Sequence, residues 1–235
     1  MNNLNVNHNL RNLVIGNTSQ LSHYFPEDYV KISSRNIPDE VFAERWGNIY
    51  ICFAEQRTFL NNADVFFGTN CAYTGRVIDR LKYERLYYYS TLYLWNALDE
   101  FDVNTPFNYH QTPYIESKDQ ITRYIMGKIN TTVLFPCNFN SIYRKDGFLF
   151  GKVFDSIRNK RKIHLGETNF IKEMTHPRMV VEESFGTEHK LIRGVMVNVN
   201  EVIRELYSRS GLVYEDYVTE FNQGKEDLIE AMLSD

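Results

Sequence analysis

Short apolar runs alternate with amphipathic stretches through the first 140 residues of the chain. Five runs have the length and composition of buried strands, at residues 13–15, 30–32, 48–54, 86–90 and 131–136. Apolar residues at helical spacing predict helices over 63–81 and 113–129. Buried strands that alternate with helices are typical of βαβ units. We therefore predict an α/β fold with a Rossmann-like, doubly wound parallel sheet.

Beyond residue 140 the pattern is looser. It predicts a helix over 148–157, a short strand over 162–165, a helix over 198–208 that begins at the capping residue Asn198, and an acidic amphipathic helix over 225–233. The Asn-rich residues 1–10 are expected to form a disordered tail. The predicted organisation is thus a tail, a Rossmann-like core over 11–140, and a smaller part over 141–235 that also holds the last elements of the core.

Composition and charge narrow the classes of function. The chain has 235 residues, with 26 Lys and Arg against 30 Asp and Glu, and a formal net charge of −4. This balance leaves no basic excess to neutralise phosphates, so we expect no nucleic-acid partner. The 3 Cys form no CxxC pair and the 6 His show no HxxxH or HExxH spacing, so we expect no metal site.

The location of the protein is also suggested by what the sequence lacks. No apolar run reaches the roughly 18 residues of a membrane span. The beginning MNNLNVNHNL has neither the basic nor the apolar region of a signal peptide. Three widely separated cysteines fit a reducing compartment. We therefore predict a cytoplasmic protein without a membrane span.

A turn that could bind an anion follows the first strand. The stretch reads Gly-Asn-Thr-Ser-Gln-Leu-Ser from Gly16. A turn at a helix N-terminus offers backbone amides to phosphate, and dinucleotide-binding folds place three glycines there. This chain keeps the first glycine and has Ser19 and Ser22 in the other two places. By itself the stretch fits an ordinary strand, turn and helix better.

Two further patterns follow in order along the chain. Tyr114 and Lys118 form a YxxxK pair after Pro113, and their spacing places both side chains on one helical face. An ammonium beside a phenol lowers the pKa of the phenol, which allows it to exchange protons with an alcohol or carbonyl. Ser90 and Thr91 end the apolar run 86–90, where a hydroxyl can hold a substrate oxygen or cap the next turn.

The order of these motifs resembles the extended short-chain dehydrogenase/reductase family, the NAD(P)-dependent epimerases, dehydratases and reductases of nucleotide sugars. The turn at Gly16 is similar to the GxTGQxG variant of dTDP-4-dehydrorhamnose reductases, with two glycines replaced by serine. The other positions that match family motifs are Ala54, Asn70 and Thr74, the segment 91–95, Tyr114 and Lys118, and the segment 133–138 that ends in Asn138.

The resemblance implies a role for each matching residue. Tyr114 would be the general acid/base, Lys118 would bind the nicotinamide ribose and tune the tyrosine, and Thr91 would hold the substrate oxygen. Asn138 would face the substrate together with Thr91, and the part over 141–235 would be a reduced substrate-binding lobe. The implied cofactor-binding residues are Gly16, Thr18, Ser19, Gln20, Leu21, Ser34, Arg35, Ala54, Asn70, Ser90 and Lys118.

The end of the second strand bears on the choice of cofactor. A carboxylate there binds the ribose of NAD, whereas an arginine accommodates the 2′-phosphate of NADP. The chain has Ser34 and Arg35 and no carboxylate before Asp39, so NADP is preferred over NAD. A role for Arg35 as an ordinary surface residue of a loop fits these residues equally well.

The resemblance implies a reductase or epimerase of a nucleotide-activated sugar, in surface-polysaccharide biosynthesis, and a homodimer formed through helices 63–81 and 113–129. Leu92 and Tyr93 stand where the dehydratases carry Asp and Glu, which argues against 4,6-dehydration. The usual third strand is short or missing between residues 32 and 49. With two glycines also lost, the alternative is a non-catalytic relative of the same fold that binds a nucleotide, a sugar or a partner chain.

Overall fold

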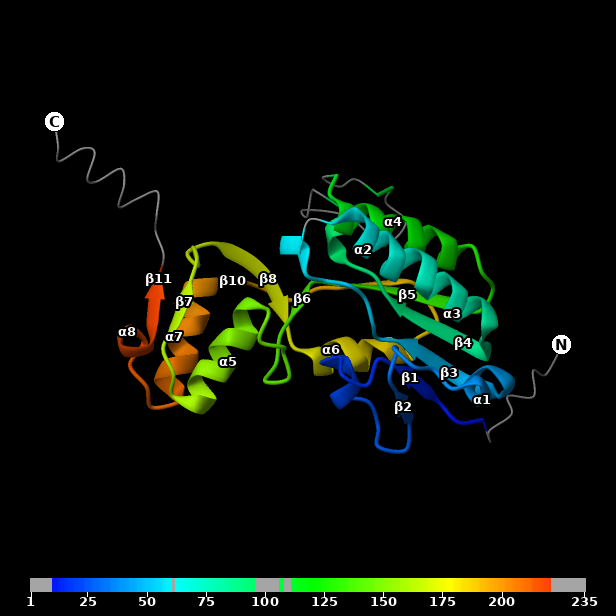
Figure 1. Ribbon diagram of the computed structural model, residues 1–235, viewed down its shortest axis with the longest axis horizontal. Helices are drawn as coiled ribbons and strands as arrows, with labels where there is room; N and C mark the ends of the chain where they lie inside the picture. Colours follow the sequence, from blue (N-terminus) through cyan, green and yellow to red (C-terminus); the bar gives the residue numbers. More distant parts are fainter. Residues whose placement is uncertain (1–9, 61, 96–105, 108–110, 221–235) are drawn as a thin grey trace. The chain divides into compact units, whose positions relative to one another are not determined.

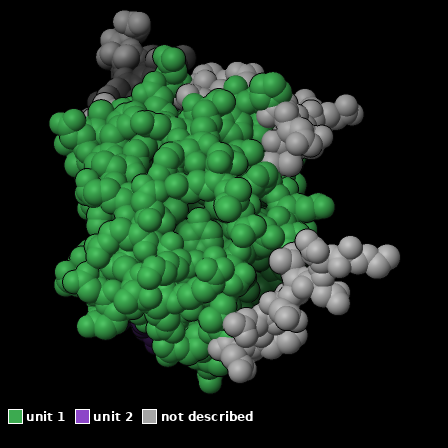
Figure 2. Space-filling view, turned by 90° about the vertical axis from the view of Figure 1, so that its right-hand side faces the viewer, with its two compact units in different colours: residues 1–139, 175–193 green, residues 140–174, 194–235 purple. Residues whose placement is uncertain are grey.

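A computed structural model describes residues 10–60, 62–95, 106–107 and 111–220 of the chain (Figure 1). The described residues form two compact units, which are treated separately. The first comprises residues up to 139 together with 175–193, and the second comprises 140–174 together with the residues from 194 onward. The described residues of the first unit, green in the space-filling view, form one continuous body (Figure 2).

The first unit is built on a six-stranded sheet with the order β2-β1-β3-β4-β5-β9. All five strand pairs are parallel. The predicted Rossmann-like parallel sheet is therefore confirmed. The strands are β1 (Leu13–Ile15), β2 (Val30–Ile32), β3 (Arg45–Ile51), β4 (Lys82–Tyr89), β5 (Thr131–Pro136) and β9 (Lys190–Ile192). The short strand β6 (Asn138–Phe139) follows β5.

Helices cover both faces of this sheet, as the doubly wound prediction requires. A continuous helical segment follows β3, made of α2 (Ala63–Phe66), a π-helix η3 (Phe67–Tyr73) and α3 (Thr74–Arg80). The π-helix was not expected from the sequence. The other helical elements of the unit are η1 (Leu21–His23), α1 (Asp39–Ala43), η2 (Thr58–Leu60), η4 (Leu92–Leu94), α4 (Pro113–Met126), α6 (Pro177–Glu182) and η5 (Glu183–Phe185).

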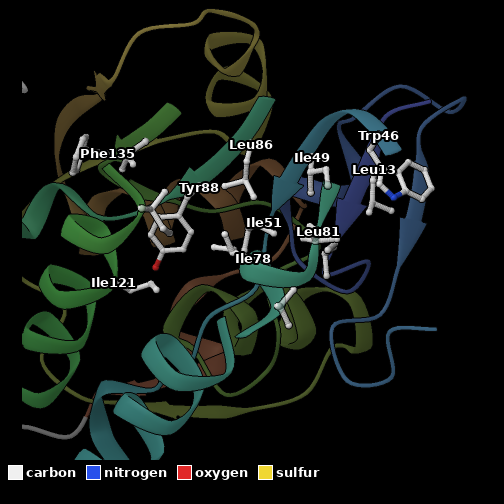
Figure 3. Packing of buried hydrophobic residues seen from close by; sticks show 14 of the residues in the cluster. Leu13, Trp46, Ile49, Ile51, Ile78, Leu81, Leu86, Tyr88, Ile121 and Phe135 are labelled. Carbon is white, nitrogen blue, oxygen red and sulfur yellow. The ribbon is translucent and has the colours of Figure 1, made fainter. Parts of the chain in front are cut away.

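Successive strand residues point to opposite faces of the sheet, so the core has two halves. On one face Ile51 and Tyr88 pack against Ile78 of α3 and Ile121 of α4 (Figure 3). On the other face the strand residues pack against η1 and α6, in a cluster of Val14, Leu21, Phe25, Tyr50, Cys52, Tyr87, Tyr89, Leu134, Val180, Val181 and Ile192. The sheet is therefore buried on both sides.

The β2 edge of the sheet is shortened. β2 has β1 on one side and no partner on the other among the described residues. The chain passes from β2 through the five-residue α1 directly into β3, which pairs with the opposite side of β1. The expectation that the usual third strand is missing is thus confirmed for the part of the chain that the structure describes.

The expected helix after Gly16 is wrong. The segment forms a three-residue 3-10 turn, η1, instead of an α-helix. Pro26 and the early start of β2 at Val30 leave little chain for a longer helix. Ser22 stabilises the tight turn, because its hydroxyl donates to the carbonyls of Asn17 at 2.8 Å and Ser19 at 2.7 Å.

The second unit has its own apolar core. The core residues are Phe150, Val153, Leu165, Met174, Val199, Ile203, Tyr207, Tyr214 and Val218. Strands β8 and β10 pair antiparallel, and β7 and β11 pair in parallel. The elements are α5 (Leu149–Asn159), β7 (Ile163–Leu165), β8 (Ile171–Thr175), β10 (Val195–Asn198), α7 (Val199–Arg209), α8 (Tyr214–Tyr217) and β11 (Val218–Glu220).

The predicted helix 148–157, strand 162–165 and helix 198–208 correspond to α5, β7 and α7. Each boundary differs by two residues or fewer. Asn198 caps α7 as expected, because its side chain accepts from the backbone N–H of Glu201. The predicted helix over 225–233 and most of the predicted tail over 1–10 lie outside the described residues.

Gly16 is required by packing at the end of β1. Its φ is +112°, and a Cβ there would lie 2.9 Å from the carbonyl carbon and oxygen of Cys52. We expect Gly16→Ala to lower the free energy of unfolding by about 1–3 kcal/mol or more, measured by urea denaturation. Gly68→Ala is the matched control, since a Cβ at Gly68 would meet nothing within 4 Å and its helical backbone suits alanine. Equal stability of the two variants would contradict this role of Gly16.

Candidate active site

Polar side chains gather where the parallel strands of the first unit end. In open α/β sheets, ligands bind at the carboxyl ends of the strands. Four of the sequence-predicted sets follow such ends: the turn at Gly16 after β1, Ala54 after β3, Ser90 and Thr91 after β4, and Asn138 after β5. The topology therefore brings these predicted sets to one edge of one sheet, and α4 adds Tyr114 and Lys118 beside β4 and β5.

Lys118 is the buried cation of this edge. Its side chain is 1% exposed, and Nζ donates to the Tyr88 hydroxyl and to the Tyr89 carbonyl, both at 2.8 Å. Nζ also lies 4.6 Å from the centroid of the Tyr88 ring. Burial disfavours the ammonium and lowers the pKa of Lys118 to about 7. The charge of this side chain is therefore finely balanced at neutral pH and depends on uncharged acceptors.

Tyr114 is set by the start of α4. Thr112 caps the helix by accepting from the backbone N–H of Ile115, and Pro113 occupies the first turn. Tyr114 is half-buried and packs edge-on against Phe66, with ring centroids 5.8 Å apart. Lys118 follows one helical turn later, so the pair shares a helical face as the sequence predicts.

Ser90 and Thr91 have different partners at the end of β4. The Ser90 hydroxyl is 2.6 Å from the Thr122 hydroxyl of α4 and is buried. The Thr91 Oγ1 caps η4 by accepting from the backbone N–H of Tyr93 at 3.3 Å. No acceptor among the described residues takes the hydroxyl proton of Thr91.

Asn70 joins the end of β3 to α4. Its side-chain oxygen accepts from the backbone N–H of Glu55 at 2.7 Å, and its Nδ2 donates to the Glu55 carbonyl at 3.2 Å and to the Ser117 hydroxyl at 3.0 Å. Asn70 sits in the π-helix η3 and is 1% exposed. Such helices recur at functional sites because they redirect side chains. Ala54, immediately before Glu55, is half-buried.

The turn after β1 departs from a phosphate-binding loop. The backbone N–H groups of Gly16 and Asn17 both donate to the Ile32 carbonyl, at 2.9 and 3.0 Å, and that of Ser19 donates to the Gly16 carbonyl at 2.9 Å. These amides are already used within the protein. No α-helix begins here, so the helix dipole that favours phosphate in a dinucleotide fold is absent from this turn.

The other predicted residues of this turn differ in their exposure to solvent. Thr18 is exposed, whereas Leu21 is buried in the core. Gln20 is buried, and its Nε2 donates to the Phe139 carbonyl at 3.3 Å, which links the turn to β6. Gln20 therefore ties two strand ends together on the edge of the sheet.

Ser34 and Arg35 follow β2, as predicted. The Ser34 carbonyl accepts from the hydroxyl of Tyr73, which anchors the strand end to the π-helix. The backbone N–H of Arg35 donates to the Ser33 hydroxyl at 3.1 Å, and the Arg35 side chain is exposed. The guanidinium thus lies on the surface at the place where a ribose phosphate is expected.

Asn138 contacts the segment after Thr91. Its Nδ2 donates to the hydroxyl of Tyr93 at 2.6 Å, and 44% of Tyr93 is exposed. Phe135 is completely buried against Trp95. His176 caps α6 by accepting from the backbone N–H of Arg178.

Sequence reasoning missed Tyr88, Ser117 and Thr122, the residues that connect α4 to the sheet and to the π-helix. A signal existed for the last two, because they are polar residues among the buried positions Ile115, Ile121 and Ile125 of an amphipathic helix. Buried polar groups require hydrogen-bond partners, so their position alone predicts a network. Tyr88 carried no such signal, since tyrosine is common in buried strands.

No group of three or more His, Cys, Asp or Glu in the described ranges could hold a metal ion. Within the same ranges, no helix combines the length and apolarity needed to cross a bilayer.

No protein-family model matches the sequence, and no curated protein does. Solved structures do match the fold. A double mutant of the dTDP-glucose 4,6-dehydratase from Streptomyces venezuelae, bound to NAD, has a TM-score of 0.72 at 17% identity, over 90% of this chain and 84% of that one. The UDP-glucose 4-epimerase from Thermotoga maritima, with UDP-glucose, has a TM-score of 0.71 at 14% identity, over 92% and 87%. RMD from Pseudomonas aeruginosa, complexed with NADPH, has 0.71 at 12%, over 90% and 87%.

These likenesses establish that the chain has the Rossmann-type fold of nucleotide-sugar dehydratases and epimerases. At these identities, the shared fold does not establish which reaction this chain catalyses.

The buried ammonium makes a testable contribution to stability. The folded-state pKa of Lys118 is lowered, so the unfolded chain binds more protons between about pH 7 and pH 10.5, and the unfolding free energy rises with pH by at most about 1.4 kcal/mol per pH unit. We expect Lys118→Met to remove this rise, measured by urea unfolding from pH 6.5 to 9.5. The exposed Lys152→Met is the control, and parallel pH curves for wild type and Lys118→Met would contradict the shift.

Proposed function

We propose that this chain is an NAD(P)-dependent reductase or epimerase of a nucleotide-activated sugar, with a role in surface-polysaccharide biosynthesis. The observation that supports it most is the buried ammonium of Lys118, one helical turn after Tyr114 and beside the end of β4, where Thr91 offers a hydroxyl proton. A buried lysine with a strongly lowered pKa at a ligand-binding sheet edge is typical of a functional site.

Part of the site fits a nicotinamide cofactor. The Lys118 ammonium, Asn70 with its clamp on Glu55, and Ala54 lie on the edge after β3 and β4 where the nicotinamide half would bind. Thr18 and Arg35 are exposed and follow β1 and β2, where the other half would bind. When bound, the cofactor would supply or accept a hydride.

The protein's own residues would then handle protons and orientation. The Tyr114 phenol would give a proton to a substrate oxygen or take one from it. The charged form of Lys118 would favour the phenolate, because an ammonium attracts the negative charge. Thr91 would donate its hydroxyl proton to the same substrate oxygen and hold it near Tyr114. Burial by the surrounding core limits competition from water.

A second candidate is a non-catalytic relative that binds a nucleotide, a sugar or a partner chain. The specific observation in its favour is the turn after β1, where the amides of Gly16, Asn17 and Ser19 are used internally. A dinucleotide would have to be held with few of these amides. The homodimer and the substrate-binding role of the C-terminal part stay predictions.

The catalytic assignment is tested by Tyr114→Phe. We expect NADPH binding, followed by fluorescence and thermal shift, to remain within about threefold, because only the hydroxyl is lost. We expect turnover of NADPH with UDP- or dTDP-linked 4-keto sugars to fall by about 10²–10⁴-fold, the range of general acid–base catalysis. Tyr124→Phe, on the exposed side of the same helix, is the control. Full activity of Tyr114→Phe would refute the assignment, and absence of NADPH binding by wild type at millimolar concentration would favour the non-catalytic candidate.

The cofactor preference is tested at Arg35. If its guanidinium contacts the 2′-phosphate, Arg35→Ala removes a charge-assisted hydrogen bond of about 1.5–3 kcal/mol. We expect the Kd for NADPH to rise roughly 10- to 100-fold while the Kd for NADH stays constant. The control Arg76→Ala, another exposed arginine of the first unit, should alter neither value. An equal loss for both cofactors would show that Arg35 does not select NADP.

A further inference from the structure

Tyr88 is a second tyrosine in contact with the lysine of the proposed site. We propose that Tyr88 is a positioning residue, whose hydroxyl holds the Lys118 ammonium in place and in its charged form and thereby sets the pH range over which the site works. This inference rests on the proposed function. It concerns a residue that none of the sequence motifs contains.

The position of Tyr88 in β4 directs its side chain toward α4. Tyr88 shares a sheet face with Leu86, and its hydroxyl points to the side where Ile121 of α4 lies (Figure 3). The side chain is 1% exposed. The hydroxyl oxygen accepts from Lys118 Nζ at 2.8 Å, and the same nitrogen lies 4.6 Å from the ring centroid. Tyr88 thus interacts with the Lys118 ammonium in two ways, through a hydrogen bond to its hydroxyl oxygen and through a cation–π contact with its ring.

Packing alone does not explain a hydroxyl at this position. A buried hydroxyl costs free energy unless it is hydrogen-bonded, and phenylalanine would fill nearly the same volume. Among the described hydrogen bonds, the Tyr88 oxygen has Lys118 as its partner. The neighbouring tyrosines of β4 face the opposite side of the sheet, in the cluster that includes Val14 and Val180. Of the three, Tyr88 is therefore placed to act on Lys118 through its side chain.

Among the described residues, no carboxylate forms an ion pair or a hydrogen bond with Lys118. The titratable groups that act on Lys118 and Tyr88 are Cys71 from the π-helix and Tyr114 from α4. Burial raises the pKa of the Cys71 thiol, which keeps it protonated at neutral pH. The charged form of Lys118 therefore depends on the Tyr88 hydroxyl and the Tyr89 carbonyl. Loss of the hydroxyl removes one of these two acceptors, which lowers the pKa of Lys118 further.

The test compares Tyr88→Phe with wild type in two measurements. In the first, NADPH-dependent turnover is recorded from pH 5.5 to 9. Because the ammonium is the active form, activity falls as the pH rises through the pKa of Lys118. We expect Tyr88→Phe to move this fall to lower pH by about half a unit to one unit, so that activity drops about three- to tenfold at pH 8 and less than about twofold at pH 6. Tyr87→Phe is the matched control, since it removes a hydroxyl from the same strand on the opposite face.

The second measurement needs no cofactor. The unfolding free energies of wild type and Tyr88→Phe are each compared with the same background carrying Lys118→Met, from pH 5.5 to 9.5. The rise that Lys118 contributes should begin at lower pH in Tyr88→Phe. Circular dichroism establishes that the variant is folded.

The outcomes separate the two proposals. An active enzyme with unshifted curves in both measurements overturns the role of Tyr88 and leaves the proposed function standing. Wild-type protein that neither binds nor consumes NADPH at any pH overturns the proposed function and, with it, the role of Tyr88 in that site. Shifts of both curves in Tyr88→Phe, with Tyr87→Phe unchanged, support both proposals.

Discussion

The candidate site depends on a single costly interaction, the burial of the Lys118 ammonium between α4 and β4. An isolated charge away from water is strongly disfavoured, so the protein must supply partners or lose the charge. It supplies two uncharged oxygens, from the Tyr88 hydroxyl and the Tyr89 carbonyl, and an aromatic ring. Both oxygens belong to adjacent residues of one strand, so the register between α4 and the sheet determines whether Lys118 has partners at all. The Ser90–Thr122 contact and the Asn70–Ser117 contact hold the same register from either side. The hydrogen bonds that hold Lys118 therefore also help to fix the packing of α4 on the sheet.

The two ends of the proposed ligand-binding edge differ in construction. After β3 the buried Asn70 is joined to Ser117, and at the end of β4 the buried Lys118 is joined to Tyr88 and Tyr89. After β1, backbone amides of the turn donate to the Ile32 carbonyl at the end of β2. Among the described residues, β2 is the last strand at this edge of the sheet. A fold of this type can lose a peripheral strand and shorten a helix because such changes expose little of the central core. The central strands tolerate no such loss, because they are covered on both faces. The half of the edge that holds the proposed catalytic residues rests on those strands.

Much of the fold could be predicted, and for one physical reason. Buried parallel strands must be apolar on both faces, so runs such as 13–15 and 131–136 stand out from their surroundings. The segment after Gly16 could not be predicted correctly, because whether a turn continues as an α-helix depends on where the next strand starts. The π-helix was also hidden, since its backbone pattern differs from an α-helix while its residues do not. Of the candidate site, the motif order located Thr91, Tyr114 and Lys118. The partners of these residues could not be read from motifs because they come from other elements.

The sequence by itself determined the class of fold, the order of the strands' apolar runs and the spacing that puts Tyr114 and Lys118 on one helical face. These properties are local, since they follow from periods of two and 3.6 residues along the chain. Only the tertiary structure decided that Lys118 meets Tyr88, that Ser90 is turned toward Thr122, and that the amides after β1 are used within the protein. Each of these contacts joins segments that are distant in sequence, or depends on how a strand end is packed. Their existence follows from the requirement that every buried polar group find a partner, and the identity of the partner is set by the packing of helices on the sheet.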